Sequence, residues 1–389
     1  MNISTNRTWA EVDLDTIAAN MRIIRQMTSK NARLLAVVKA DAYGHGAENT
    51  ARVMLENGAD FLAVACTDEA QQLRSCGINA PILILGHTPE SDFDRIAALN
   101  VTAAIFGIAD AKKLALAAKR LGKTAKVHIK LDTGMNRIGF PADDENTPRD
   151  IYEIYNTDGI EVEGIFTHFA KADENDDAYT LMQYKKFTDC VRKLERLGVE
   201  IPIKHVCNSA AIIKFKNMHL DMVRAGIISY GLRPSPDVEI KNFGLKPAMS
   251  IKSAVSRIQY IEKGQKISYG GTFTAPHNMK IATIPIGYAD GYMRNLSNKA
   301  RVIIGGEYAG IVGKICMDQC MIDVTDVNNI SVGDTAAVMG RSDGKEVSCE
   351  FLADICGTIN YEIVCAVSRR VPRVYLRNGK ITDVVNYLV

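Results

Sequence analysis

The chain has 389 residues, 47% of them hydrophobic, so it can bury a substantial core and is long enough for two domains. Lys and Arg number 47 against 45 Asp and Glu, and this near-balance argues against nucleic acid or an anionic membrane as the partner. The polar residues 1–12 lack the apolar segment of a signal peptide, and runs such as Leu34–Val38 are too short to span a membrane. The nine cysteines are scattered, which predicts reduced thiols and no metal site in a cytoplasmic protein.

Short apolar runs alternate with longer amphipathic stretches as far as about Tyr230. Eight of these runs are predicted to be strands: Leu34–Val38, Phe61–Val64, Ile82–Leu85, Thr102–Phe106, Lys126–Leu131, Val162–His168, Ile203–Val206 and Met222–Ile227. The stretches between them have apolar residues at helical spacing, as in His45–Asn57, Ala109–Leu121 and Ala178–Leu197. Eight β/α units predict a closed (β/α)₈ barrel of the TIM type. A doubly wound open sheet is the alternative, but no G-x-G-x-x-G follows the first strand.

The pattern changes after about Lys241, where helical periodicity mostly stops. Short strand-like runs separated by turn signals follow: Ile251–Ile261, Lys280–Ile286, Arg301–Ile304, Tyr308–Ile315, Met321–Val324, Thr335–Met339 and Arg373–Tyr375. This predicts a mostly β C-terminal domain. The expected organisation is therefore a strand in residues 1–13 that pairs with the β domain, a barrel over 14–240 and the β domain over 241–389.

Catalytic groups of barrel enzymes lie at the C-terminal ends of the strands, so the polar residues after each apolar run are the candidates. They are Lys39, Tyr43, Arg137, His168, Asn208, Ser209 and Arg224. Lys39 follows a fully apolar run, and a lysine in a partly desolvated barrel mouth has a lowered pKa that suits Schiff-base formation. A single lysine at a strand end more commonly reaches solvent, so the prediction depends on the whole set.

A phosphate site is predicted in the loops after strands seven and eight. Ser209 follows strand seven, while Gly226 and Ile227 follow strand eight. Barrel enzymes often bind phosphate there through backbone N–H groups and a helix N-terminus. Close packing explains Gly226 equally well when that residue is taken alone. A Schiff-base lysine after strand one, facing a phosphate site after strands seven and eight, is what pyridoxal phosphate requires.

Several longer motifs resemble bacterial alanine racemases. Residues 36–46, AVVKADAYGHG, are similar to the cofactor-lysine signature of that family. Further similar segments follow in the family's order: 131–139 (LDTGMNRIG), 167–169 (THF), 208–209 (NS), 224–227 (RAGI), 268–270 (SYG), 287–291 (GYADG) and 316–319 (CMDQ). They cover nearly the whole chain. The resemblance implies a pyridoxal-phosphate enzyme with a barrel and a β domain, acting as a homodimer that supplies D-alanine for peptidoglycan.

The resemblance implies two catalytic bases on opposite faces of a pyridoxal-phosphate aldimine. Lys39 carries the cofactor and is one base, and Tyr269, from the second domain of a partner subunit, is the other. A tyrosine normally loses its proton near pH ~10, so His168 and Arg224 are implied as groups that ease its ionisation. The guanidinium of Arg224 is implied to face the pyridine nitrogen. Because arginine stays protonated, that nitrogen stays unprotonated, which favours racemisation over transamination or decarboxylation.

The remaining site residues follow from the same resemblance. The phosphate is implied to be held by Tyr43, Ser209, Gly226, Ile227 and Tyr361, and Asn208 is implied to bind the cofactor. Arg137 and the backbone amide of Met317 match positions near the substrate carboxylate, with the catalytic Asp318 beside them, and Tyr288 matches an entrance residue. Lys130 matches a position that is often carbamylated, a change that converts a repelling cation into an anion beside Arg137.

Two residues depart from the family pattern, and three other functions stay open. Lys314 stands where arginine is frequent and Arg369 where tyrosine is common, which affects substrate preference more than the reaction. A serine or broad-specificity racemase is one alternative, because an apolar pocket rejects an added hydroxyl only weakly. A non-catalytic pyridoxal-phosphate carrier is another, although such proteins typically lack a second domain with Tyr269. A decarboxylase of this architecture is the third, and it would need a carboxylate in place of Arg224.

Overall fold

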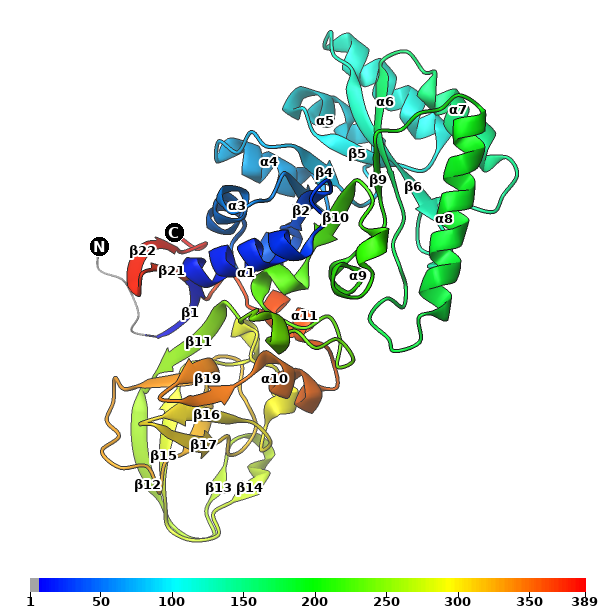
Figure 1. Cartoon of the computed structure of the whole chain (residues 1–389). Helices are drawn as coiled ribbons and strands as arrows, with labels where there is room; N and C mark the ends of the chain where they lie inside the picture. Colours follow the sequence, from blue (N-terminus) through cyan, green and yellow to red (C-terminus); the bar gives the residue numbers. More distant parts are fainter. Residues whose placement is uncertain (1–6) are drawn as a thin grey trace. The chain divides into compact units, whose positions relative to one another are not determined.

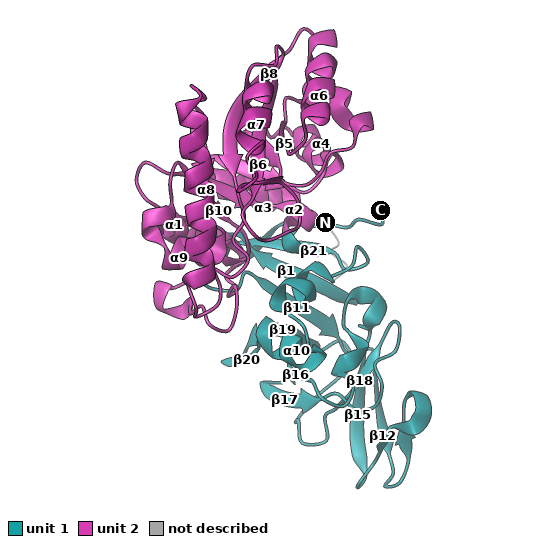
Figure 2. Cartoon of the chain, turned by 90° about the vertical axis from the view of Figure 1, so that its right-hand side faces the viewer, with its two compact units in different colours: residues 1–16, 43–46, 246–389 teal, residues 17–42, 47–245 magenta. Residues whose placement is uncertain are grey.

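The computed structural model describes residues 7–389, which form two compact units. One unit contains the chain up to residue 16, residues 43–46 and residues 246–389, and the other contains residues 17–42 and 47–245 (Figure 2). The short segment 43–46 thus groups with the C-terminal part of the chain, although only residues 38–42 separate it from the first barrel strand.

The second of these units contains a ring of parallel strands with helices outside it (Figure 1). Its strands are β2 (Arg33–Val37), β3 (Phe61–Val64), β4 (Ile82–Ile84), β5 (Thr102–Ile105), β6 (Ala125–Asp132), β8 (Ile160–Phe166), β9 (Ile203–His205) and β10 (Met222–Ala225). They pair in the order β10-β2-β3-β4-β5-β6-β8-β9, with the short β7 (Phe140–Pro141) on β6. The ring nearly closes between β9 and β10, where Asp221 N donates to Lys204 O and Arg224 N to Cys207 O, each at 3.1 Å.

Most residues of the barrel strands are apolar because both faces of the strands are covered. Every residue of β3, β4, β5 and β10 is buried. One face fills the barrel interior and the other packs under helices, as in other parallel sheets. The helices are α1 (Leu14–Met27), α3 (Ala47–Glu56), α4 (Thr67–Ser75), α5 (Phe93–Leu99), α6 (Ile108–Arg120), α7 (Thr147–Tyr155), α8 (Ala178–Arg196) and α9 (Ser209–Lys214). The predicted (β/α)₈ barrel is confirmed.

The other unit is mostly β. Its main sheet has the order β17-β16-β19-β11-β1-β21-β22, with β20 on β19. The bounds are β1 (Thr8–Asp13), β11 (Met249–Ala254), β16 (Arg301–Ile304), β17 (Glu307–Gly310), β19 (Thr335–Ser342), β20 (Lys345–Val347), β21 (Arg373–Arg377) and β22 (Lys380–Val385). Strand β1 pairs antiparallel with β11 and parallel with β21. Two smaller sheets join β12 (Arg257–Ile261), β15 (Met279–Ile284) and β18 (Cys320–Asp323), and β13 (Lys266–Ile267) and β14 (Phe273–Thr274).

The sequence prediction is wrong in some details of these elements. The run Ile251–Ile261 is two strands in different sheets, β11 and β12, because the chain bends at 255–256 where Ser256 N donates to Thr283 O. Two short helices, α10 (Cys349–Cys356) and α11 (Asn360–Cys365), were not expected in the β domain. His168 does not end a strand, since β8 stops at Phe166. Apolar runs predict which segments are extended, but they do not predict where the backbone turns.

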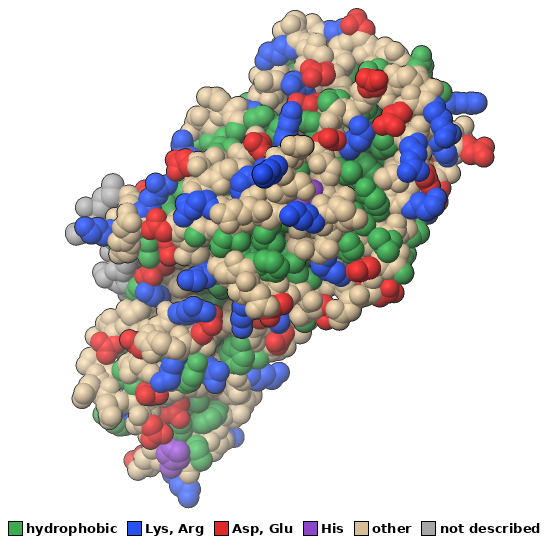
Figure 3. Space-filling view, in the orientation of Figure 1, with side chains coloured by type: hydrophobic (Ala, Val, Ile, Leu, Met, Phe, Trp, Pro, Cys, Tyr) green, Lys and Arg blue, Asp and Glu red, His purple; other side chains and the backbone are tan. Residues whose placement is uncertain are grey.

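The surface charges are mixed. On the face shown in Figure 3, Lys and Arg side chains are interspersed with Asp and Glu. Many form exposed pairs, such as Lys113–Glu90 and Arg120–Asp94, each at 2.6 Å. Exposed pairs of this kind contribute little stability. Among residues 7–389, no helix has the length and apolar character needed to cross a membrane.

Candidate active site

Lys39 begins a left-handed turn directly after the first barrel strand. The segment α2 (Lys39–Tyr43) has φ of 52–53° at Ala40, Asp41 and Ala42, a conformation that L residues rarely adopt in succession. Two carboxylates hold it. Glu69 of α4 accepts from the N–H of Ala40 and of Ala65 through its two oxygens, each at 2.7 Å. Asp41 accepts from Ala47 N at 2.7 Å. Strain that is held in place this way is typical of functional sites.

Arg224 on β10 is buried and almost fully bonded. Its Nη1 donates to Nδ1 of His205 at 2.9 Å and to the carbonyl of the same residue at 3.1 Å. Its Nη2 donates to the carbonyls of Thr167 and Val206, at 2.8 and 3.0 Å, and lies 3.3 Å from Nδ1 of His168. Within residues 7–389, no acceptor is bonded to its Nε–H. Burial lowers the pKa of the guanidinium to about 10, so the group is still a cation at neutral pH.

His168 is a neutral imidazole among cations. Burial lowers its pKa well below the ordinary value, and the charges of Arg224, Lys130, Arg137 and Lys39 act in the same direction. Lys130 lies on β6 and Arg224 on β10, whereas Lys39, Arg137 and His168 follow β2, β6 and β8. Each of these residues lies in the C-terminal half of a barrel strand or just after it, and Nη2 of Arg224 lies 3.3 Å from Nδ1 of His168, so the group is at the C-terminal end of the strands.

The loops after β9 and β10 are bonded to each other. Asn208 caps α9 by accepting from Ala211 N at 3.0 Å. The buried hydroxyl of Ser209 accepts from Gly226 N at 2.9 Å, and Ile227 follows as the first residue of a short 3₁₀ turn. The predicted phosphate loops therefore meet, and they do so at the barrel end that carries Arg224.

Lys130 and Arg137 lie on β6 and the loop that follows it. Burial lowers the pKa of Lys130 to about 7, and Arg224 acts in the same direction. The Lys130 ammonium nitrogen donates to Leu131 O at 2.8 Å. Asp132 organises the loop by accepting from the backbone N–H of Gly134 and Arg137, at 2.8 and 3.1 Å. The Arg137 side chain is exposed.

Tyr269 lies at the tip of a small hairpin in the mostly β unit. Strands β13 and β14 pair as Lys266↔Thr274 and Ile267↔Phe273, with Tyr269 in the turn between them. Its side chain is 67% exposed. Ser268 adopts φ 64° and its hydroxyl donates to Lys314 O at 2.6 Å, which fixes the base of the turn. The Tyr269 side chain is therefore not part of the hydrophobic core of its own unit.

Asp318 is held by an arginine that the sequence did not single out. Arg370 donates to its carboxylate at 2.8 Å and also lies 3.7 Å from Asp290. Asp290 is fully buried and forms a two-point pair with Arg7, with both distances 2.9 Å. Met317 precedes Asp318, and its carbonyl accepts from Ala289 N at 3.0 Å. The loop that carries Asp318 is therefore braced by charge pairs.

Tyr43 and Tyr361 are neighbours, with ring centroids 6.1 Å apart. Burial raises the pKa of Tyr43, so its hydroxyl remains a hydrogen-bond donor at neutral pH. Tyr288 is 42% exposed and Met317 52%. These residues belong to the mostly β unit, whereas the groups around Arg224 belong to the barrel.

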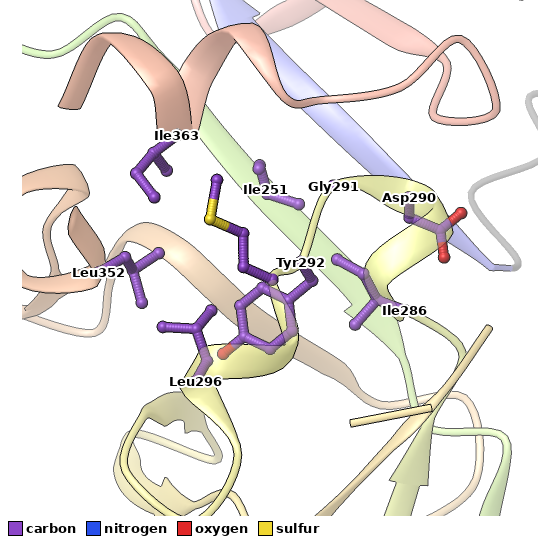
Figure 4. A pocket seen from close by; sticks show the side chains of 9 residues that line it. Ile251, Ile286, Asp290, Gly291, Tyr292, Leu296, Leu352 and Ile363 are labelled. Atoms are coloured by element: carbon purple, nitrogen blue, oxygen red, sulfur yellow. The ribbon is translucent and has the colours of Figure 1, made fainter. Parts of the chain in front are cut away.

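A small cavity elsewhere in the mostly β unit does not have the features of an active site. It is lined by apolar side chains that include Ile251, Leu352 and Ile363 (Figure 4). The Asp290 carboxylate points away from it, toward Arg7. The hydroxyl of Tyr292 is buried and has no hydrogen-bond partner within the described chain. A small apolar space with one neutral hydroxyl offers no acid or base for catalysis.

Sequence reasoning missed several residues of the candidate site. Glu69 and Arg370 gave no signal, because charged residues on helices and loops are usually solvated, whereas Asp290 lies in the motif 287–291 but was assigned no role. His205 did carry one, since it is a polar residue inside the apolar run 203–206. Such a buried polar side chain needs a partner, which here is Arg224.

The fold and the barrel mouth define a class: two-domain barrel enzymes with a lysine after the first strand. Known proteins narrow this class to one family. The model of the alanine racemase N-terminal domain matches residues 12–234, and that of the C-terminal domain matches residues 248–375. The chain belongs to the alanine racemase family, and it is therefore an enzyme of the isomerase class.

Individual relatives are similar over their whole length. An alanine racemase of Clostridium perfringens is 47% identical over 388 residues, which is 100% of both chains. The alanine racemase structure of Clostridium difficile 630 has a TM-score of 0.96 with 43% identity, again over 100% of both chains. Its complex with cycloserine has a TM-score of 0.92 with 41% identity, covering 98% of this chain and 99% of that one. The resemblance inferred from the sequence motifs is confirmed.

Proposed function

We propose that the protein interconverts L-alanine and D-alanine, with pyridoxal phosphate bound to Lys39. The main support is Arg224, a buried cation whose Nε–H has no acceptor within the described chain. An unprotonated pyridine nitrogen is an acceptor that fits this donor, whereas a protonated one would repel it. The loops of Ser209 and Gly226 are joined by the hydrogen bond from Gly226 N to Ser209 Oγ, which leaves the hydroxyl proton of Ser209 to donate to the phosphate.

When it is bound, pyridoxal phosphate supplies the electron sink that makes the α-proton of an amino acid acidic. The protein contributes proton transfer and positioning. Lys39 and Tyr269 act as the two bases, one on each face of the substrate, so that a proton leaves one side and returns on the other. Arg224 limits protonation of the ring, and this suppresses transamination.

The other residues bind and orient. Tyr43, Ser209, Gly226, Ile227 and Tyr361 hold the phosphate, and Asn208 also binds the cofactor. Arg137 and the amide of Met317 receive the substrate carboxylate, and Asp318, which follows Met317 in the chain, is held by Arg370. His168 is neutral and therefore offers a lone pair or a single N–H rather than a charge.

Circular dichroism of L-alanine incubated with the protein and pyridoxal phosphate tests the proposal. We expect the signal to fall to zero while the amount of amino acid stays constant. A signal that persists, although the protein is yellow and absorbs as a Schiff base, would contradict the proposal and leave a cofactor carrier. The same assay with L-serine decides between an alanine racemase and a broader one. We propose a cytoplasmic enzyme whose D-alanine serves peptidoglycan synthesis.

Lys130 is predicted to be carbamylated. With a pKa of about 7 it is largely a neutral amine at pH 8, so its nitrogen can attack CO₂, forming an N–C bond and releasing a proton. The carbamate is then an anion that can pair with Arg137. Because protonation blocks the amine, the modification should increase from pH 6 to pH 8 and be lost again on acidification.

Carbon-13 NMR in labelled bicarbonate measures this modification directly. Lys126 on the same strand is the matched control, because hydrogen bonds and charge from Glu163 and Glu161 outweigh its desolvation and raise its pKa. Lys130→Met should remove the carbamate signal and Lys126→Met should not. An unmodified Lys130 at pH 8 in bicarbonate would disprove the prediction.

A homodimer with composite sites is predicted, in which Tyr269 acts on the site that contains Lys39 of the other subunit. Lys39→Ala and Tyr269→Phe homodimers should both be nearly inactive. After equal mixing and subunit exchange, hybrids have one complete site, so activity should recover to about one quarter of wild type. Mass spectrometry of the mixture confirms exchange. Hybrids that form but stay inactive, or a fully active monomer in sedimentation, would contradict the model.

A further inference from the structure

A chain of buried polar side chains continues behind Arg224 through the barrel interior. Nδ1 of His205 accepts from Arg224, and Nε2 of the same ring lies 2.8 Å from Nδ1 of His128. Nε2 of His128 lies 3.5 Å from a carboxylate oxygen of Glu163. Both histidine rings have no exposed surface. The chain therefore links a buried cation to a carboxylate two rings away.

The barrel makes room for this chain at one glycine. His128 on β6 is paired with Gly164 on β8. A Cβ at position 164 would lie 2.6 Å from the imidazole of His128, closer than any side chain can approach. Gly164 thus allows the ring to lie across the strand, where its Nδ1 meets His205 and its Nε2 faces Glu163. Glu163 is the residue directly before this glycine.

The direction of the hydrogen bonds is determined by Arg224. A guanidinium has donors and no acceptor, so Nδ1 of His205 must accept and its Nε2 must carry the proton. That N–H then requires Nδ1 of His128 to accept, which places the proton of His128 on Nε2, facing Glu163. Burial lowers the pKa of both rings, so each is neutral and carries one proton. One arrangement of protons satisfies both hydrogen bonds and points the remaining N–H of His128 toward the Glu163 carboxylate, 3.5 Å from Nε2.

Glu163 completes the chain as an anion. One oxygen lies 3.1 Å from Lys126, and the other accepts from Thr102 at 3.2 Å and faces His128. Burial acts to raise its pKa, but contacts with His128 and Lys126 outweigh this and lower it to about 2. Within the described chain, no carboxylate lies within salt-bridge distance of Arg224 itself. Along these contacts, the negative charge that is nearest to the Arg224 cation is the Glu163 carboxylate, which is connected to it through the rings of His205 and His128.

We propose that Glu163 and His128 are positioning residues that fix the tautomer of His205 and thereby the orientation of Arg224. The proposal rests on the proposed function, in which Arg224 faces the pyridine nitrogen. Without the carboxylate, the proton of His128 is free to move to Nδ1. It then faces the N–H of His205, and that conflict spreads to the bond between His205 and Arg224.

Glu163→Gln is the informative variant. The two oxygens of the Glu163 carboxylate accept from Lys126 and face His128 separately. The amide of a glutamine at this position has a single acceptor oxygen for both. Because the size of the side chain is unchanged, the fold should be preserved. Glu161→Gln is the matched control: Glu161 lies two residues earlier on β8 and 3.7 Å from the same Lys126. Glu161 makes no contact with His128 among those that the structure records.

Two measurements test the proposal, one of which does not need the cofactor. Long-range proton–nitrogen NMR of the apoprotein with ¹⁵N-labelled imidazoles reports the tautomer of each of the seven histidines. We expect His128 and His205 to be neutral with the proton on Nε2 in the wild type and in Glu161→Gln. In Glu163→Gln, His128 should populate the other tautomer. The holoenzyme ratio of racemisation to transamination events should fall about tenfold in Glu163→Gln and stay unchanged in the control.

The outcomes separate the inference from the proposed function. Protons on Nδ1 in the wild-type rings would overturn the inference, and so would a Glu163→Gln variant with unchanged NMR or an unchanged ratio. A wild-type protein that does not racemise alanine would disprove the proposed function instead. In that case the apoprotein NMR would still decide whether Glu163 sets the tautomers.

Discussion

Replacing Arg224 with glutamate is expected to lower the rate of alanine racemisation by about 10³-fold, because a preorganised charged donor is lost from the site. The new carboxylate would favour a protonated pyridine nitrogen, so transamination should increase relative to racemisation. The expected signature is therefore a change of reaction as well as a loss of rate. Chiral chromatography of the alanine, together with measurement of pyruvate, follows both products.

Folding must be controlled in this experiment, because Arg224 satisfies the carbonyls of Thr167 and Val206 in a buried place. Each unpaired carbonyl costs about 1–3 kcal/mol. Arg224→Lys keeps the positive charge but lacks the planar set of N–H donors of the guanidinium. Its ratio of racemisation to transamination should therefore lie between those of the wild type and Arg224→Glu. Arg192→Glu, at an exposed position on α8, should change neither product. An Arg224→Glu protein that folds, binds the cofactor and keeps the wild-type ratio of products would contradict the role of Arg224.

Replacing Tyr269 with phenylalanine is expected to lower racemisation by about 10²–10⁴-fold, which is the usual contribution of a positioned acid or base. Stability should not change, since the side chain is 67% exposed and at the tip of a hairpin. One enantiomer of alanine should still exchange its α-proton with solvent deuterium, because Lys39 remains on its own face. Inversion to the other enantiomer should be lost.

Tyr260→Phe is the matched control for this variant. Tyr260 lies on β12 of the same unit and is 80% exposed, so the same change of atoms is made at a site with no proposed chemistry. Proton NMR in D₂O follows exchange, and polarimetry follows inversion. If Tyr269→Phe exchanged and inverted both enantiomers as the wild type does, a tyrosine base would be excluded.

The barrel could be predicted from the sequence because its cause is local. Strands buried on both faces must be apolar along their length, and helices between them must have one apolar face. Runs such as Phe61–Val64 and helices such as Ala178–Arg196 therefore show directly in the order of residues. Lys39, Ser209 and Arg224 could be found in the same way, since strand ends mark the functional edge of a barrel.

The left-handed turn after Lys39 could not be predicted. Alanine disfavours positive φ, and aspartate adopts it only as a single residue, so the conformation of Ala40, Asp41 and Ala42 depends on Glu69 and Asp41 accepting nearby N–H groups. A carboxylate 29 residues away gives no local signal of that contact. The bracing of Asp318 by Arg370 is hidden for the same reason.

The series of side-chain contacts from Arg224 to Glu163 could not be predicted from local sequence. His128, Glu163 and His205 are ordinary residues in three separate strands, and 77 positions separate the two histidines. They become neighbours because β6 pairs with β8 in a register that sets His128 against Gly164. A strand's residue pattern tells which side chains are buried, whereas the register between strands decides which buried groups meet. Buried polar groups must find partners, and that requirement is met in three dimensions.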